Sequence, residues 1–359
     1  MKTAGFFNIK VWAGAFAVAA ALCVAAPAAA QDRYAAIVMD ARTNEVLLEE
    51  MADEARFPAS LTKMMTLYMI FEALERGDIT LDTRWTASRN AARQPPSRLG
   101  LGCTRRRGCD SITVEQAIRA LVVQSANDVA VLTAERLGGT EARFAANMTA
   151  RARELGLTNT RFANASGLPD ARHRTTARDM ARLSQALWND FPEYYHYFST
   201  PNFSWRRASG RNHNRLLGQV EGVDGIKTGY TRASGFNLAT MTERNGRRVI
   251  VVVLGGETAA ARDAQVAYLI EGAYQEYARR ADPNAPMLAS MPTNRLDAQR
   301  ATGTLSASSQ SAAPASPYST YQGMVVETLS PVRVPIEPLA QGDESGPSGE
   351  DGEAANAEE

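Results

Sequence analysis

The stretch Arg247-Arg248-Val249-Ile250-Val251-Val252-Val253-Leu254 decides the fold class of this chain. Its five consecutive β-branched residues favour a strand, and a continuous apolar run indicates a strand that is buried on both faces. Residues 236–241, just before it, predict a second strand. Near the other end of the pattern, residues 35–39 and 45–48 flank a turn at 40–44 and predict a β-hairpin.

Helical patterns fill the sequence between these two groups of strands. They cover residues 60–76, 117–123, 127–137, 141–155 and 176–188, and a last helix is predicted at 259–279. Thr113 and Gln116 form a capping-box pattern before the second of them. This order predicts an α+β fold, in which an antiparallel sheet carries a mostly helical insertion. Short strands joined by hairpins argue against a doubly wound parallel sheet.

Composition is typical of a globular protein. Of 359 residues, 45% are hydrophobic and 22% are charged, and the formal net charge is zero. No overall charge therefore favours nucleic acid or an anionic membrane as a partner. We interpret the local cluster Arg105-Arg106-Arg107 as a solvated loop.

The two ends of the chain differ from its middle. Lys2 and Lys10, an apolar run at 11–26 and alanines at 28–30 predict a signal peptide over residues 1–30, and hence export to the periplasm or cell envelope. An uncleaved membrane anchor is the alternative, but the run is short for a span. Residues 282–359 contain low-complexity Ala/Ser/Pro-rich and acidic segments, which predict a disordered tail.

Two cysteines remain after the leader, Cys103 and Cys109. In an oxidising compartment they form either a small disulfide-closed loop, which we favour, or a pair of free thiols. We expect no metal site, because two cysteines do not complete one and the histidines His173, His196 and His213 lack ligand spacing.

The first of three motifs is Ser60-Leu61-Thr62-Lys63, which opens a predicted helix after Pro58. A serine at a helix start gains unpaired N–H groups and the positive end of the helix dipole, which favour a developing oxyanion. Lys63 lies one turn further along and can take the Ser60 proton if its amine is uncharged. Burial and a second cation, for which Lys227 is the candidate, both favour that state. Alternatively, Ser60 is only a helix cap and Lys63 a solvated charge.

Ser125-Ala126-Asn127 interrupts two helical patterns. Serine and asparagine compete for backbone hydrogen bonds, so the motif is either a simple helix break or a functional junction. In the functional interpretation, Ser125 relays a proton to a leaving amine and Asn127 binds a substrate amide.

Lys227-Thr228-Gly229 precedes the strand pair. A strand edge there can add a peptide-like substrate as an extra strand. Lys227 then supplies positive charge for a terminal carboxylate, Gly229 lets backbones approach closely, and the Tyr230 N–H becomes a second oxyanion donor. The alternative is a turn that enters a strand, with Lys227 exposed.

In this order, the motifs resemble those of the penicillin-binding serine D-alanyl-D-alanine carboxypeptidases, within the β-lactamase-like acyl-transferases. The resemblance covers residues 34–277. It includes the following segments: Phe57-Pro58-Ala59-Ser60-Leu61-Thr62-Lys63, Ser125-Ala126-Asn127-Asp128, Phe162 to Leu168, Asn212-His213-Asn214 and Asp224-Gly225-Ile226-Lys227-Thr228-Gly229. It implies a β-lactamase/transpeptidase-like catalytic domain over residues 31–281.

The resemblance also implies the chemistry. Ser60 is then the nucleophile, Lys63 the base and Ser125 the proton relay, while Asn127, Lys227, Thr228, Gly229 and Tyr230 bind the substrate. The reaction removes the terminal D-alanine from peptidoglycan stem pentapeptides without a cofactor or metal, and β-lactams are covalent inhibitors. A cationic residue at position 213 helps hold the carboxylate in the family, so His213 would act only when protonated.

Other functions use the same residues. A class A β-lactamase would carry an E-x-x-L-N segment between the last two motifs, which this chain lacks. A DD-endopeptidase that cleaves peptide cross-links and a penicillin-binding sensor or cell-wall-binding module without turnover remain alternatives. Many members of the family carry a C-terminal β-domain and an amphipathic membrane helix. The low-complexity tail predicts neither here, so we expect no C-terminal membrane anchor.

Overall fold

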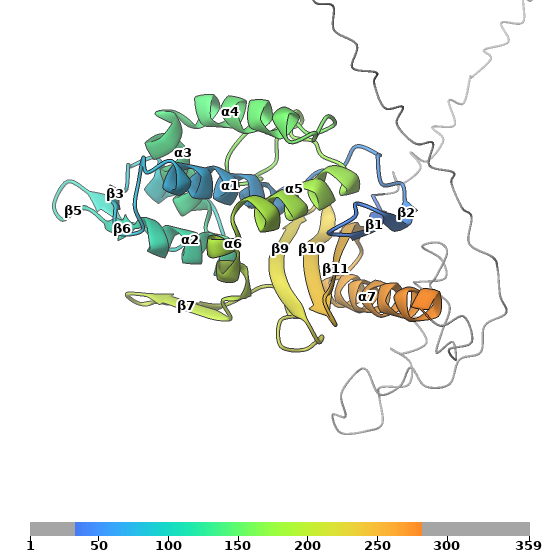
Figure 1. The fold of residues 1–359 in the computed structure, drawn as a ribbon. Coiled ribbons are helices and arrows are strands. Elements are labelled where there is room, and N and C mark those ends of the chain that lie inside the picture. Colours follow the sequence, from blue (N-terminus) through green and yellow to red (C-terminus); the bar gives the residue numbers. More distant parts are fainter. Residues whose placement is uncertain (1–32, 282–359) are drawn as a thin grey trace, which may run out of the picture.

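A five-stranded antiparallel sheet forms the centre of the computed structural model, which describes residues 33–281 (Figure 1). The strand order is β2-β1-β11-β10-β9. The strands are β1 (Ala35–Asp40), β2 (Val46–Glu50), β9 (Val223–Thr231), β10 (Gly235–Arg244) and β11 (Arg247–Gly256). The predicted signal peptide and tail lie outside the described residues.

Strand β11 explains why the sheet is buried on both faces. Ile250, Val252 and Leu254 belong to one hydrophobic core, and the alternating Val249, Val251 and Val253 belong to another. Alternation arises because successive side chains of a strand point to opposite faces. The prediction of a strand buried on both faces is confirmed.

Each core is closed by a different set of helices. Figure 1 shows helices α1 to α5 on one side of the sheet and α7 (Ala259–Ala281) on the other. The first set comprises α1 (Thr62–Glu75), α2 (Val114–Val123), α3 (Asn127–Gly138), α4 (Glu141–Glu154) and α5 (Ala177–Asp190). Thr113 caps α2 with the expected capping box, because its side chain accepts from the Gln116 N–H and the Gln116 side chain accepts from the Thr113 N–H. The predicted sheet with a mostly helical insertion is therefore confirmed.

Short elements were not predicted. They are the 3₁₀ turns η1 (Ala59–Leu61), η2 (Ala91–Arg93) and η3 (His196–Ser199), helix α6 (Pro192–Tyr195), and the strand pairs β3 (Arg84–Thr86) with β6 (Ser111–Thr113), β4 (Cys103–Thr104) with β5 (Gly108–Cys109) and β7 (Asn202–Trp205) with β8 (Ala208–Arg211). Elements of two to four residues are too short to show a periodic pattern. The start of α1 was misplaced for the same reason. The helix begins at Thr62, and Ser60 lies in the short turn η1, which the sequence pattern did not show.

Cys103 and Cys109 face each other in the β4–β5 hairpin and form a disulfide, as the favoured alternative predicted. Within residues 33–281, no helix combines the length and apolar character that a membrane span requires.

Candidate active site

The three motifs meet where the helical layer joins the edge of the sheet. Ser60 lies in η1 and Lys63 in the first turn of α1, while Ser125 stands between α2 and α3. Lys227 lies in β9, an edge strand of the sheet. Segments far apart in the sequence thus contribute to one site.

Lys63 is the centre of the site. Its side chain is fully buried, and its Nζ lies 3.2 Å from Ser60 Oγ. The same nitrogen donates to Asn127 Oδ1 at 2.7 Å and to the Ser166 carbonyl oxygen at 2.6 Å. The alternative in which Lys63 is a solvated helix charge is wrong.

The electrostatics of Lys63 favour a neutral amine. Burial lowers its pKa well below that of an ordinary lysine, and the charge of Lys227 lowers it further, whereas the Asp128 carboxylate acts in the opposite direction. A neutral amine has two hydrogens and one lone pair. The two short contacts go to oxygens that can only accept, so they take both hydrogens and leave the lone pair facing the Ser60 hydroxyl.

Asn127 is oriented by a loop that precedes it in the sequence. Its Nδ2 donates to the Pro96 carbonyl oxygen at 2.6 Å, which leaves Oδ1 to face Lys63. Its backbone N–H donates to the Ser97 carbonyl oxygen, also at 2.6 Å. The Asp128 carboxylate holds the same loop by accepting from the N–H groups of residues 99–101 at 2.8 to 3.0 Å. Asn127 therefore positions Lys63, a role that its motif alone did not indicate.

A second loop supplies the other acceptor of Lys63. Asn164 Oδ1 accepts from the Gly167 N–H at 2.7 Å and the Ser166 N–H at 3.2 Å, and Asn164 Nδ2 donates to the Leu168 carbonyl oxygen at 3.0 Å. Gly167 has φ +85°, and a Cβ there would overlap the Ala59 carbonyl oxygen beside the nucleophile. The loop is thus shaped to bring the Ser166 carbonyl to Lys63.

Ser125 has an unusual backbone and an unpaired hydroxyl. Its φ is +53°, in the left-handed region that costs a non-glycine residue roughly 1–2 kcal/mol. Its Oγ is buried and has no hydrogen-bond partner among residues 33–281. Unpaired buried hydroxyls are rare, and strained residues cluster at functional sites. These two features make Ser125 a candidate functional residue.

The edge of β9 lies directly against the nucleophile. A Cβ on Gly229 would stand 2.9 Å from the Ser60 nitrogen and 3.0 Å from the Pro58 oxygen, so only glycine allows this approach. Asn237, which pairs with Gly229 across β10, donates to the Phe57 and Pro58 carbonyl oxygens at 3.0 and 3.1 Å. The segment before Ser60 is therefore held onto the sheet. Within the described residues, β9 pairs only with β10, so no strand pairs with its other edge.

Lys227 is buried as well, which contradicts the alternative of an exposed lysine in a turn. Burial and the nearby Arg262 guanidinium lower the pKa of Lys227 to about 7. Its Nζ donates to the Thr228 carbonyl oxygen at 3.1 Å. Partial burial, together with the charge of Lys227, lowers the pKa of His213 to about 4, although the residue as a whole is exposed. His213 is therefore neutral at pH 7 and supplies no positive charge to the site at that pH.

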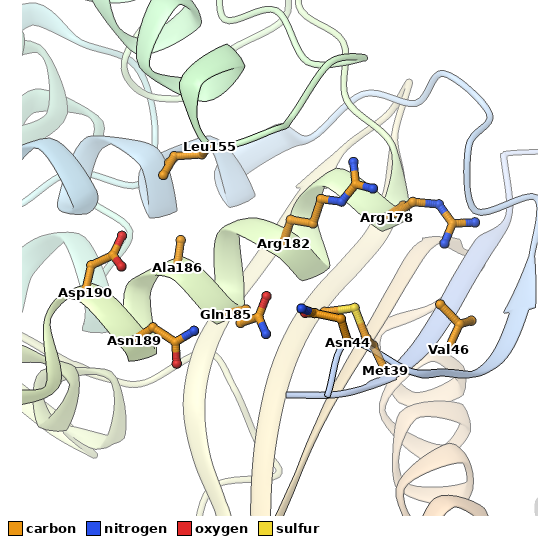
Figure 2. A pocket seen from close by; sticks show the side chains of 10 residues that line it. All are labelled: Met39, Asn44, Val46, Leu155, Arg178, Arg182, Gln185, Ala186, Asn189 and Asp190. Atoms are coloured by element: carbon orange, nitrogen blue, oxygen red, sulfur yellow. The ribbon is translucent and has the colours of Figure 1, made fainter. Parts of the chain in front are cut away.

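A cavity of about 290 Å³ adjoins Ser60, between Phe57–Ala59, residues 167–173 and the end of β9. A larger cavity of about 420 Å³, shown in Figure 2, lies between α5 and the β1–β2 hairpin and contains none of the motif residues. One of its two arginines, Arg178, is already paired with Glu49 and Asp53. No group of three or more His, Cys, Asp or Glu side chains in residues 33–281 is arranged to hold a metal ion.

Residues 23–258 match the protein family described as D-alanyl-D-alanine carboxypeptidase. The chain belongs to this family. Among curated members, it is 37% identical to D-alanyl-D-alanine carboxypeptidase DacC of Escherichia coli over 67% of this chain and 60% of that protein. It is 33% identical to DacD of Salmonella typhimurium over 69% of this chain and 64% of that protein. The chain thus spans less than two thirds of the length of these relatives.

Solved structures of two penicillin-binding proteins share the fold. Penicillin-binding protein 5 from Haemophilus influenzae is 32% identical, with a TM-score of 0.63 over 67% of this chain and 70% of that chain. Penicillin-binding protein D2 from Listeria monocytogenes, in its ampicillin-bound form, is also 32% identical, with a TM-score of 0.58 over 66% of this chain and 95% of that chain. The predicted β-lactamase/transpeptidase-like fold is confirmed.

Within this carboxypeptidase-family site, direct contacts join Ser60, Lys63 and Asn127, and Lys227 acts on Lys63 through its charge. The Ser125 hydroxyl has no hydrogen-bond partner in the part of the chain that the structure describes. Sequence reasoning missed the residues that support the site rather than face the substrate. They are Pro96, Ser166, Asn237 and Arg262. Ser166 lies in the segment Phe162 to Leu168 that carried the resemblance, which was the available signal. The others gave none, because a backbone acceptor, a distant charge and a single asparagine within a strand have no local motif.

Proposed function

We propose that this chain is an exported serine DD-carboxypeptidase that removes the terminal D-alanine from peptidoglycan stem pentapeptides through an acyl-enzyme on Ser60. The observation that supports it most is the buried Lys63 amine, which lies 3.2 Å from Ser60 Oγ while two carbonyl oxygens take its hydrogens. A neutral amine in this position is a general base for a serine nucleophile. Family membership supports the substrate.

In the proposed acylation, Ser60 gives its proton to Lys63 as Oγ attacks the carbonyl of the penultimate D-alanine. The Ser60 and Tyr230 N–H groups stabilise the oxyanion. The Lys63 ammonium then returns the proton, through the unpaired Ser125 hydroxyl, to the departing D-alanine nitrogen. Water subsequently hydrolyses the ester, with Lys63 again as base. β-Lactams acylate Ser60 by the same attack.

Substrate binding in this proposal follows the sheet. The peptide adds to the outer edge of β9. Because Gly229 allows β9 to approach Ser60 closely, the scissile carbonyl of the peptide comes to lie beside Ser60. Lys227 and Thr228 bind the terminal carboxylate, and Asn127 orients the peptide amide. We also propose that residues 1–30 are a signal peptide, that 31–281 form the catalytic domain and that 282–359 are a tail outside it. The protein would act in the periplasm or cell envelope.

Labelling with a fluorescent penicillin tests the acylation. We expect stoichiometric covalent labelling that is lost in Ser60→Ala. A protein that takes no label, or a Ser60→Ala variant that keeps it, would refute the proposal.

Turnover separates the remaining functions. Multiple-turnover release of free D-alanine from a pentapeptide supports the carboxypeptidase. Faster cleavage of cross-linked dimers would instead identify an endopeptidase, and labelling without turnover a sensor.

A further inference from the structure

Two short hairpins, β4–β5 and β7–β8, carry a concentration of arginines. The segments that contain them, residues 98–114 and 199–220, hold eight arginines and a single acidic residue, Asp110. Asp110 directly follows β5 and pairs with Arg206 in the turn between β7 and β8, so this ion pair brings the two hairpins together. Both hairpins lie at the same end of the helical layer (Figure 1). The one acidic group of these segments is therefore already neutralised.

The arginines of the two hairpins form a basic surface. All six are exposed, and apart from Arg206 none of them forms an ion pair within residues 33–281. Clustered positive charge without acidic partners attracts an anionic group from outside the domain. We call this surface the arginine face. It comprises Arg105, Arg106, Arg107, Arg206, Arg207 and Arg211.

The arginine face borders the candidate site through both hairpins. Gln124, which directly precedes Ser125, donates to the Phe203 carbonyl oxygen of β7 at 3.3 Å. The other hairpin begins where the loop of Pro96 ends, and the Pro96 carbonyl oxygen accepts from Asn127. An anionic group bound to the arginine face therefore lies beside the entrance to the site.

The chain itself contains a segment of the opposite charge. Residues 282–359 hold eleven acidic and three basic side chains, and seven of the acidic ones stand within residues 343–359, which contain no basic residue. Since the whole chain has a formal net charge of zero, the part that precedes residue 282 is net basic. Fully extended, residues 282–342 can reach over roughly 200 Å, which is several times the diameter of a domain of this size. Their length therefore allows residues 343–359 to meet the arginine face.

We propose that residues 343–359, here called the acidic segment, bind the arginine face of the same chain and compete there with anionic ligands that approach the site. Carboxylates of the segment pair with guanidinium groups of the face. Because both belong to one chain, the binding is intramolecular, so a set of individually weak, exposed ion pairs is enough to hold the segment. The competition with ligands rests on the proposed function, whereas the binding of the segment does not.

A variant with a neutral segment tests the binding. A dye-labelled peptide with the sequence of residues 343–359 is titrated against the full-length protein and followed by fluorescence anisotropy. At low salt, we expect the peptide to bind the neutral-segment variant at least about 10-fold more tightly than the wild type, whose own segment occupies the face. Binding should weaken at least about 5-fold when the salt concentration rises to about 0.2 M, since salt screens exposed charges. The neutral-segment variant carries Asp343→Asn, Glu344→Gln, Glu350→Gln, Asp351→Asn, Glu353→Gln, Glu358→Gln and Glu359→Gln.

Two results of this titration would overturn the inference. One is a peptide that does not bind the neutral-segment variant at low salt. The other is equal affinity for the variant and the wild type, which would show that the face is open to a separate anionic partner and does not hold the segment of its own chain.

Two triple variants, each made in the neutral-segment protein, locate the binding. The substitution of glutamine for Arg105, Arg106 and Arg107 should weaken peptide binding by about 10-fold. The matched control removes the same charge from three other exposed arginines that form no ion pair within residues 33–281, and it should keep the affinity. Equal losses in both would show that the peptide responds only to the total charge and would refute the site. The control positions are Arg153, Arg161 and Arg247.

Acylation by a fluorescent penicillin, which carries a carboxylate, tests the competition. At low salt, the second-order rate constant should be about 3-fold higher for the neutral-segment variant than for the wild type, and the difference should vanish at about 0.5 M salt. Equal rate constants at low salt would overturn the competition. If neither protein is acylated, the proposed function fails, and the anisotropy titration still decides whether the segment binds the arginine face.

Discussion

Asn127→Asp tests whether Lys63 works as a neutral amine. The substitution is nearly isosteric, but it replaces the amide oxygen 2.7 Å from Lys63 Nζ with a carboxylate oxygen. A negative charge at that position stabilises the ammonium and so raises the pKa of Lys63, which opposes the lowering by burial and by Lys227. The variant should therefore hold Lys63 in the protonated form, which cannot accept the Ser60 proton.

The distance sets the size of the effect. Two unit charges 2.7 Å apart attract by about 6 kcal/mol at an effective dielectric constant of about 20. Relaxation of the new carboxylate away from the Pro96 carbonyl oxygen, which it can only repel, lowers that figure. With about half of it retained, acylation near pH 7 should fall on the order of 100-fold, because 1.4 kcal/mol corresponds to a factor of ten.

The assay is the rate of acylation by a fluorescent penicillin as a function of pH. Because the variant keeps a base that is merely protonated, its rate should recover about tenfold for each pH unit as the solution becomes more alkaline. Asn189→Asp adds the same charge at an exposed position of α5 and should behave as the wild type (Figure 2).

Two results would refute the reasoning. A variant that acylates at the wild-type rate near pH 7 would show that the charge state of Lys63 does not limit the reaction. A loss of the expected size that does not recover at alkaline pH, in a protein with a normal melting temperature, would show that Asn127 acts through geometry alone.

Three further predictions concern other parts of the structure. Because the pKa of Lys227 is about 7, kcat/KM for peptides with a free terminal carboxylate should fall about tenfold per unit above that pH, whereas the pH profile of C-terminal amides should lack this decline. Gly229→Ala places a Cβ 2.9 Å from the Ser60 nitrogen, so penicillin acylation should fall by about 100-fold while the melting temperature changes by only a few degrees. Arg248→Met removes the guanidinium that binds Asp224 at 2.6 Å. The free energy of unfolding should fall by about 2 kcal/mol, and the melting temperature should fall by roughly 4–8 °C in a thermal scan. An unchanged melting temperature would mean that the Arg248–Asp224 ion pair contributes nothing to stability.

The sequence predicted the sheet and its helical insertion because both have long periodic patterns. The alternation of β11 between two cores and the capping box of α2 are local properties of the chain. It did not predict the exact start of α1. Ser60 stands in a 3₁₀ turn, and the two residues before this turn are held by Asn237, which is far away in the sequence.

In the candidate site too, the sequence predicted what depends on local motifs and did not predict what depends on distant contacts. The motifs named the candidate catalytic side chains, and the structure places Ser60 and Asn127 in direct contact with Lys63. They did not indicate that Asn127 positions Lys63, since that role depends on the Pro96 carbonyl oxygen, which has no sequence signature. The low pKa of Lys227 likewise depends on Arg262, which approaches from α7 on the far side of the sheet.

The hydrogen bonds of Asp128 show why the supporting residues matter as much as the motifs. This buried carboxylate raises the pKa of Lys63, and it lies next in sequence to the residue that Lys63 contacts. Its two oxygens accept from four backbone N–H groups, those of residues 99, 100, 101 and 129, at 2.8 to 3.0 Å. Backbone dipoles thus satisfy the charge of Asp128 without an ammonium partner. The loop that contains these N–H groups also presents the Pro96 carbonyl oxygen to Asn127, and Asn127 in turn accepts from Lys63. Asp128 therefore raises the pKa of Lys63 through its charge, but it also fixes the loop that positions the Lys63 amine.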